Sequence, residues 1–171
     1  MLKYSLIFLL LFTTGCDAKQ APDQNASAAA AAARRSAAVV INMEGKAHEL
    51  HKINQKQSSA VFESDEIRFL LTEDANAVSL NFNLTRTKIL ETGSAVYVLP
   101  KANHGTEKID LNFFNRNRDS KSIQKRILFI AGTIEIQELT RNRLRMTFKG
   151  TGQPLTGKDQ FPVEGSVNVT F

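Results

Sequence analysis

Cys16 is the only cysteine in a chain of 171 residues. One cysteine cannot form an internal disulfide, and a free thiol in an oxidising compartment is a liability unless a modification uses it. Residues 1–3 begin the chain with a positive charge, and residues 4–12 form an almost wholly apolar run ahead of the cysteine. This run is shorter than the about 20 residues that span a bilayer, so the pattern is typical of an export signal.

The residues just before Cys16 complete a more specific pattern. Thr13, Thr14 and Gly15 precede the cysteine, and Gly15-Cys16 resembles the end of the lipobox in bacterial lipoprotein signal peptides. The resemblance implies that residues 1–15 are removed as a signal peptide and that Cys16 receives a diacylglyceryl group, often with acylation of the new amine. Two or three acyl chains on one residue make a stable membrane anchor, whereas a single short chain holds only weakly.

The same resemblance gives an expected location. The mature chain would lie in the bacterial cell envelope, anchored to a membrane through Cys16 and facing the periplasm. Asp17 resembles the residue that retains enteric lipoproteins at the inner membrane. Sorting rules differ between bacterial groups, so the choice between inner and outer membrane stays open.

Two histidines are candidates for a metal site. His48 and His51 in "AHELH" would share an ion if they lay one turn apart on a helix. The surrounding pattern instead predicts a hairpin around Glu44-Gly45, in which His48 lies opposite Ile41 and His51 points to the other face. We therefore expect no metal ion here.

The sequence signals for a serine nucleophile and for a cofactor site are equally weak. Ser94 and Ser166 follow glycines but lack the second glycine of a nucleophile elbow. The carboxylates form no pattern that nominates an acid and base pair, and no phosphate-binding loop is present. We expect no catalytic residues and no cofactor.

The densest charge asymmetry lies in "NRNRDSKSIQKR". Its basic members, called here the basic cluster, are Arg116, Arg118, Lys121, Lys125 and Arg126. In a chain with a net charge of +5, a solvated loop is the simpler interpretation. As an alternative, the cluster would bind an anionic envelope component, such as lipid head groups or a cell-wall polymer, or an acidic protein. Nucleic acid is not an expected partner outside the cytoplasm, and no aromatic residues interleave with the charges.

Composition divides the rest of the chain into a linker and a domain. Residues 16–38 are rich in Ala, Gln, Asp and Ser, with alanine at every position from 28 to 33. They offer too little apolar surface to offset the entropy of ordering, which predicts a flexible tether. Residues 39–171 are numerous enough for one domain with its own core.

A period of two dominates this domain. Val78, Leu80, Phe82 and Leu84 alternate with polar residues, and similar alternation recurs within residues 67–71, 109–113, 144–148 and 163–171. Each run predicts a half-buried strand. Residues 127–136 are apolar at both parities around Gly132, which indicates a central strand with a bulge or bend.

Turn signals separate these runs at short intervals, at residues 44–45, 72–76, 91–93, 103–105 and 150–157. Together the patterns predict an all-β domain, an antiparallel β-sandwich or partly closed barrel of about 8–10 short strands after a disordered tether. The ending "GTIEIQEL…LRMTFKGTG…FPVEGSVNVTF" is vaguely similar to the last strands of small uncharacterised β-sandwich lipoproteins, a resemblance that implies no activity.

The expected function is that of a non-catalytic binding or accessory module of the envelope. One alternative is a carrier, in which the inward residues line a cavity for an apolar ligand such as a lipid. A second alternative is an enzyme whose site leaves no motif in the sequence.

Overall fold

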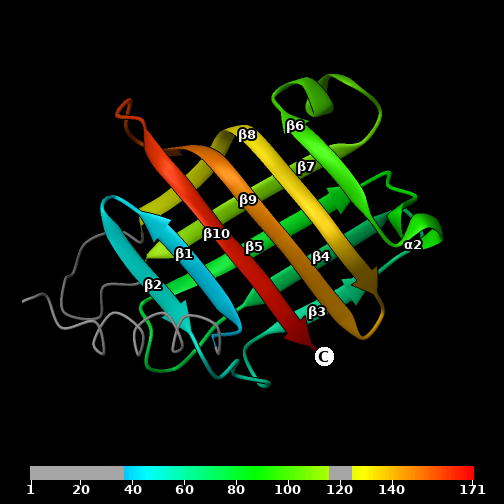
Figure 1. Cartoon of the computed structure of the whole chain (residues 1–171), viewed down its shortest axis with the longest axis horizontal. Helices are drawn as coiled ribbons and strands as arrows, with labels where there is room; N and C mark the ends of the chain where they lie inside the picture. Colours follow the sequence, from blue (N-terminus) through cyan, green and yellow to red (C-terminus); the bar gives the residue numbers. More distant parts are fainter. Residues whose placement is uncertain (1–36, 116–124) are drawn as a thin grey trace, which may run out of the picture.

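The computed structural model describes residues 37–115 and 125–171, which form one antiparallel sheet that folds over on itself (Figure 1). Ten strands follow the order β2-β1-β10-β9-β8-β7-β5-β4-β3, and β6 pairs with β8 beside this path. The curled sheet makes a half-barrel, which confirms the predicted all-β class. Cys16 and the rest of residues 1–36 lie outside the described residues.

The strands are β1 (Val39–Met43), β2 (Lys46–Leu50), β3 (Ser59–Phe62), β4 (Glu66–Leu71), β5 (Val78–Thr85), β6 (Ala95–Leu99), β7 (Lys108–Asn115), β8 (Lys125–Thr140), β9 (Arg143–Pro154) and β10 (Phe161–Thr170). Two short helical turns, α2 (Ile89–Thr92) and η1 (Lys101–His104), flank β6. The last three strands are longer than predicted, since β8 has 16 residues, β9 has 12 and β10 has 10.

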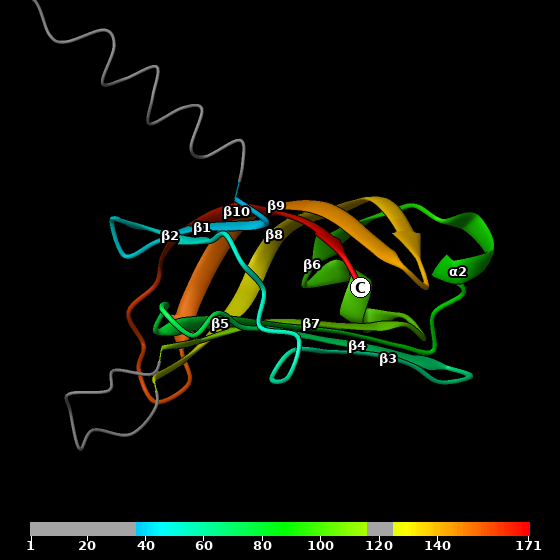
Figure 2. The ribbon, with the colours of Figure 1, turned by 90° about the horizontal axis from the view of Figure 1, so that it is seen from below.

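Strand β8 belongs to two layers. Its first residues, up to Leu128, pair with β7, whereas Gly132 to Ile136 pair with β6. A register shift between Phe129 and Ala131 bends the strand between these two segments. Figure 2 shows the result: β2, β1, β10, β9, β8 and β6 form one layer, and β7, β5, β4 and β3 form the other. We call them the six-strand layer and the four-strand layer.

Two glycines make the bend sterically feasible. Gly132 in β8 stands opposite Gly150 in β9 and has a φ of +133°. A Cβ on Gly150 would lie 2.0 Å from the carbonyl oxygen of Ala131, and one on Gly132 would lie 2.3 Å from that of Lys149. The assignment of Gly150 to a turn was therefore wrong, because this glycine lies within β9 and permits a close approach of two backbones.

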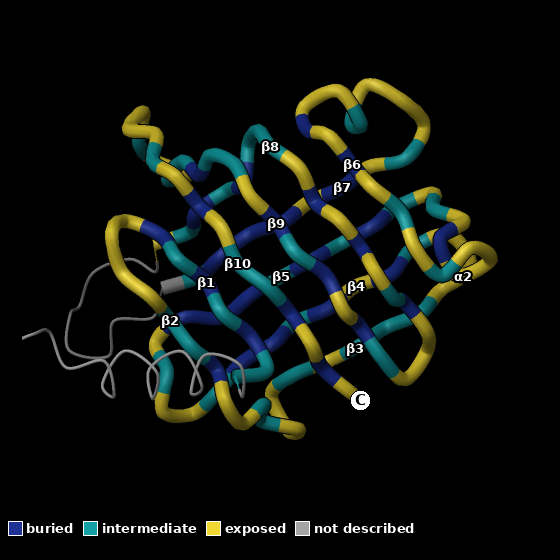
Figure 3. Tube along the Cα trace, viewed as in Figure 1, coloured by how far each residue is buried: buried dark blue, intermediate teal, exposed yellow. Residues whose placement is uncertain are grey.

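The core fills the space between the layers, as the alternating pattern predicted. Val78, Leu80, Phe82 and Leu84 of β5 are all buried. Two ring pairs join the layers, Phe113 with Phe148 at 5.6 Å between centroids and Phe69 with Phe171 at 5.4 Å. In Figure 3, buried positions run along the strands of both layers and exposed positions concentrate in the turns.

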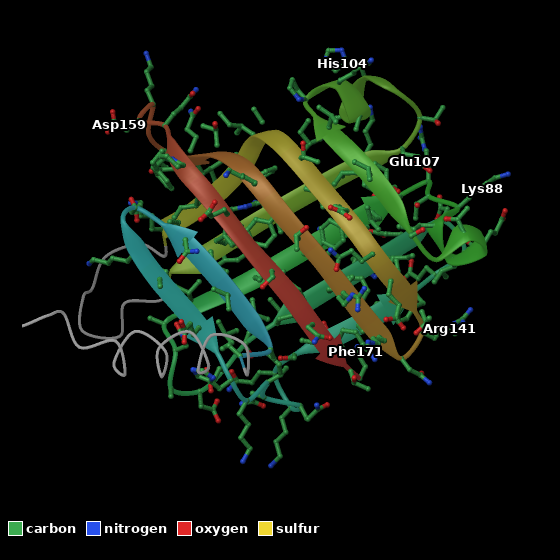
Figure 4. All side chains as sticks on the ribbon, in the orientation of Figure 1. Lys88, His104, Glu107, Arg141, Asp159 and Phe171 are labelled. Atoms are coloured by element: carbon green, nitrogen blue, oxygen red, sulfur yellow. The ribbon has the colours of Figure 1, made fainter. Side chains whose placement is uncertain are left out.

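The chain end differs from its predicted place in the last strand. Strand β10 ends at Thr170, and Phe171 lies just beyond it, near the β8–β9 hairpin that carries Arg141 (Figure 4). The backbone N–H of Phe171 donates a hydrogen bond to the carbonyl of Asn142 over 2.9 Å. Its ring stacks on the buried ring of Phe69, yet 38% of the residue remains exposed.

Replacing Gly150 by alanine should destabilise the domain by about 1–3 kcal/mol or more, because the new Cβ meets backbone atoms that cannot move without opening the β8–β9 ladder. Chemical unfolding followed by circular dichroism measures the change. Gly105→Ala is the matched control, since a Cβ there meets only the carbonyl of Ala102 at 3.4 Å. Its effect should stay under about 0.5 kcal/mol, and equal losses in the two variants would contradict the close approach.

Truncating Phe171 to alanine should cost about 1–2 kcal/mol of unfolding free energy, below the 3–5 kcal/mol typical of a fully buried phenylalanine, because the ring is only partly covered. The same unfolding measurement tests this. Thr170→Ala, at an exposed outward position, is the control and should be nearly neutral. A loss near zero for Phe171→Ala would mean that the Phe69 contact does not persist in solution.

Candidate functional site

Two members of the basic cluster begin β8, and both contact the domain itself. The Nζ of Lys125 contacts the Oε1 of Glu44 and lies 5.9 Å from the centroid of the Phe161 ring. The guanidinium of Arg126 lies 5.6 Å from the centroid of the Phe114 ring. The other members, Arg116, Arg118 and Lys121, lie outside the described residues. The structure therefore places only one end of the cluster, and both residues there already have neighbours.

His48 lies where the hairpin pattern predicted, opposite the buried Ile41 in the β1–β2 ladder. Partial burial lowers the pKa of His48 below its ordinary value, and the charge of Lys46 lowers it further, while Glu44 opposes this change. The ring of His51 lies outside the strand, with its Nε2 3.4 Å from the Oε2 of Glu49. The two histidines therefore have separate surroundings. Within residues 37–115 and 125–171, no group of three or more His, Cys, Asp or Glu side chains is arranged to hold a metal ion.

The serine candidates also lie apart. Ser94 is exposed in the segment between α2 and β6, whereas Ser166 faces outward from β10. Because Ser166 follows the inward Gly165, which pairs with Ile41, it lies on the face of the six-strand layer opposite to His48.

None of the described helices is both long and apolar enough to cross a bilayer.

A shallow depression of about 540 Å³ lies on the outward face of the six-strand layer. Its floor includes Asn42, Thr147 and Ser166, and it contains the ion pair of Lys149 with Glu164 at 3.7 Å. Arg143 of the same layer forms an ion pair with Glu138 of β8 at 3.2 Å. The charges of this face thus largely compensate one another.

The outward face of the four-strand layer has a different character. Strand β5 places Ser79, Asn81 and Asn83 there, because its alternate residues enter the core. On the β7 side, Asn81 pairs with Asn112 and Asn83 with Asp110, and on the β4 side Asn83 pairs with Arg68. We call this set, Ser79, Asn81, Asn83, Asp110 and Asn112, the polar face.

Several atoms of the polar face are buried without a partner. Ser79 is 3% exposed and Asn112 is 4% exposed, although both lie on an outward face. Five buried side-chain atoms of the described residues have no hydrogen-bond partner. Four of them lie here, on Ser79 (Oγ), Asn81 (Oδ1), Asn83 (Oδ1) and the adjoining Arg126 (Nε), while the fifth, Arg143 Nε, belongs to the ion pair with Glu138. Buried polar groups in proteins are nearly always satisfied, so their accumulation on one face marks it as unusual.

The polar face borders a hollow at the point where β7 diverges from β8. Pairing of the two strands stops at Asn112 and Leu128, and the hollow beside it measures about 330 Å³. Its polar lining comes from Asn103, Asp110, Asn112 and Arg126, and its apolar lining includes Leu128 and Ile130. The face therefore combines hydrogen-bonding groups with a recess at its border.

From the sequence, Ser79, Asn81 and Asn83 are identifiable only as the outward half of a strand. The signal in the sequence was their type, since three consecutive outward positions carry short amides or a hydroxyl and no charge. The pairing of Asn81 with Asn112 and of Asn83 with Asp110 joins residues about 30 positions apart, which the alternation of a single strand does not encode.

Comparison with known proteins adds no further guide. No family model matches the chain, and neither a curated protein nor a solved structure matched it.

The depressed pKa of His48 predicts a pH dependence of folding. Below about pH 6.5 the unfolded chain binds a proton at His48 more readily than the folded chain, so this residue lowers stability as the pH falls through that value. His48→Gln should therefore lose less stability than the parent chain between pH 7.5 and pH 5.5, as measured by urea unfolding at both values. An identical loss in the two proteins would contradict the assignment.

Proposed function

We propose that this chain is a lipid-anchored protein of the bacterial cell envelope, attached to a membrane through Cys16 and facing the periplasm. Its β domain acts as a binding or accessory module and carries out no catalysis. The charged start, the short apolar run and the Gly15-Cys16 ending support the anchor. The separation of Ser94, Ser166 and His48 onto different elements and faces supports the non-catalytic role.

The polar face is the observation that carries the binding role. Leaving a buried hydroxyl or amide oxygen without a partner costs about 1–3 kcal/mol, and three such oxygens occupy successive outward positions of β5. Unsatisfied buried groups of this kind require an explanation in a native protein, and we assign those of the polar face to binding. An apolar side chain at the same outward strand positions would spare the domain this cost.

The carrier alternative receives less support from the interior. Between the layers, the ring of Phe148 contacts those of Phe113 and Phe129, and the ring of Phe69 contacts those of Phe82 and Phe171. Side chains that face inward thus pack against each other, as in a sandwich. The basic cluster remains a second candidate surface, for an anionic envelope component.

The anchor is tested by producing the full chain in a bacterium supplied with labelled palmitate. The parent chain should incorporate the label and migrate as a processed form, whereas Cys16→Ala should do neither, because the acyl groups require the thiol. Fluorography after electrophoresis measures both.

Thr14→Ala is the matched control, since it keeps a small residue beside Gly15, and it should be labelled like the parent. Label in the Cys16→Ala chain, or its absence from the parent chain, would refute the lipoprotein assignment.

A further inference from the structure

We propose that the polar face binds a neutral glycan, whose hydroxyl groups exchange hydrogen bonds with the partly exposed amides of Asn81 and Asn83. The inference rests on the proposed function as a binding module and names the ligand class of its site. It is carried by the arrangement of the side chains on β5 and β7.

The face is a regular grid of short polar groups. Asn81 and Asn112 stand side by side on neighbouring strands, as do Asn83 and Asp110 one pleat further along. Neighbouring strands lie about 4.8 Å apart, and successive residues on one face lie about 6.6 Å apart along a strand. This spacing is on the scale of a sugar ring, so adjacent grid positions can contact hydroxyls of one residue of a glycan.

The groups on the grid match sugar hydroxyls in chemistry. A hydroxyl both donates and accepts, and an asparagine amide offers a carbonyl acceptor and an NH₂ donor that exchange places by a half-turn of the amide. The oxygens of Asn81 and Asn83 and the hydroxyl of Ser79 have no protein partner. Asn81 and Asn83 are partly exposed, so a half-turn of each amide turns its oxygen or its nitrogen toward the surface, where a ligand rich in hydroxyls supplies the matching donor or acceptor.

The charges around the grid favour a neutral ligand over an anionic one. Arg68 already forms an ion pair with Glu63 at 2.8 Å and lies 3.8 Å from Glu66. Asp110 adds a negative charge on the opposite side of Asn83. A phosphate or carboxylate beside Asn83 would therefore meet the compensated Arg68 and the exposed Asp110.

One border of the grid offers an apolar surface of the kind that sugars also use. Phe114 pairs with Ser79 across β5 and β7, and the guanidinium of Arg126 lies over its ring at 5.6 Å. The ring is partly buried, and Leu128 lies beside Asn112 in the next pair. The C–H faces of a sugar pack against such groups while its hydroxyls face the amides. A protein partner would need larger buried anchors at the centre of the contact, where this grid has amides.

The test uses the full chain, purified in detergent, and four probes: insoluble peptidoglycan sacculi, and soluble tetrasaccharides of N-acetylglucosamine, glucose linked β-1,4 and glucose linked α-1,4. We expect sacculi to sediment the protein, or at least one tetrasaccharide to bind by calorimetry, in a manner that persists in 0.5 M salt. The double variant Asn81→Val, Asn83→Val should weaken this binding at least tenfold.

The same double variant separates a binding role from a structural one. Its thermal midpoint should equal or exceed that of the parent, because valine suits a strand and removes two unpaired oxygens. Asn42→Val, an outward asparagine of the six-strand layer, is the matched control and should leave binding unchanged. A fall in midpoint together with unchanged binding would assign the two asparagines to folding and overturn the proposal.

Three further results would overturn it. They are the absence of binding to all four probes at millimolar concentration, binding that the double variant retains, and binding that is lost only when Arg116, Arg118 and Lys121 are replaced by glutamate. Labelling of Cys16 is measured separately, so a labelled chain that binds no probe rejects the glycan and leaves the proposed anchor intact. An unlabelled chain that binds a probe supports the glycan and rejects the anchor.

Discussion

The close approach of β8 and β9 at Gly132 and Gly150 is the constraint on which the architecture depends. With no Cβ on either residue, the two backbones come near enough for β8 to bend and to continue from one layer into the other. Strand β8 can then pair with β7 before the bend and with β6 after it. A single sheet thus encloses its own core, and no second sheet is needed to cover its apolar face.

The two faces of the four-strand layer obey different rules. Its inner face packs Leu80 and Phe82 into the core, where volume and shape decide which residue fits. Its outer face leaves oxygens of Asn81 and Asn83 unsatisfied, which is unfavourable for folding taken alone. Residues that lower the stability of the fold are expected on a surface that is selected for binding.

Much of the fold was predictable because strand periodicity is a local property. The alternation of Val78 to Leu84 predicted which side chains enter the core, and the hairpin around Glu44-Gly45 placed His48 opposite Ile41. Gly150 was misassigned because glycine is common both in turns and at close backbone contacts. The polar face could not be predicted in this way, because it is formed by the pairing of β5 with β7. That pairing depends on contacts across the whole chain and cannot be deduced from either strand alone.

The position of β1 in the sheet has a mechanical consequence. The chain enters the described domain at Ala37 and Ala38, and β1 is hydrogen-bonded to β2 on one side and to β10 on the other. Ala38 itself donates to Leu50 and accepts from Asn168. Tension applied at this end along the strand axis therefore loads two ladders in shear, so that many hydrogen bonds must break together. A strand at the rim of the sheet would oppose the same tension with one ladder only, so the domain is well suited to a load at its first residues.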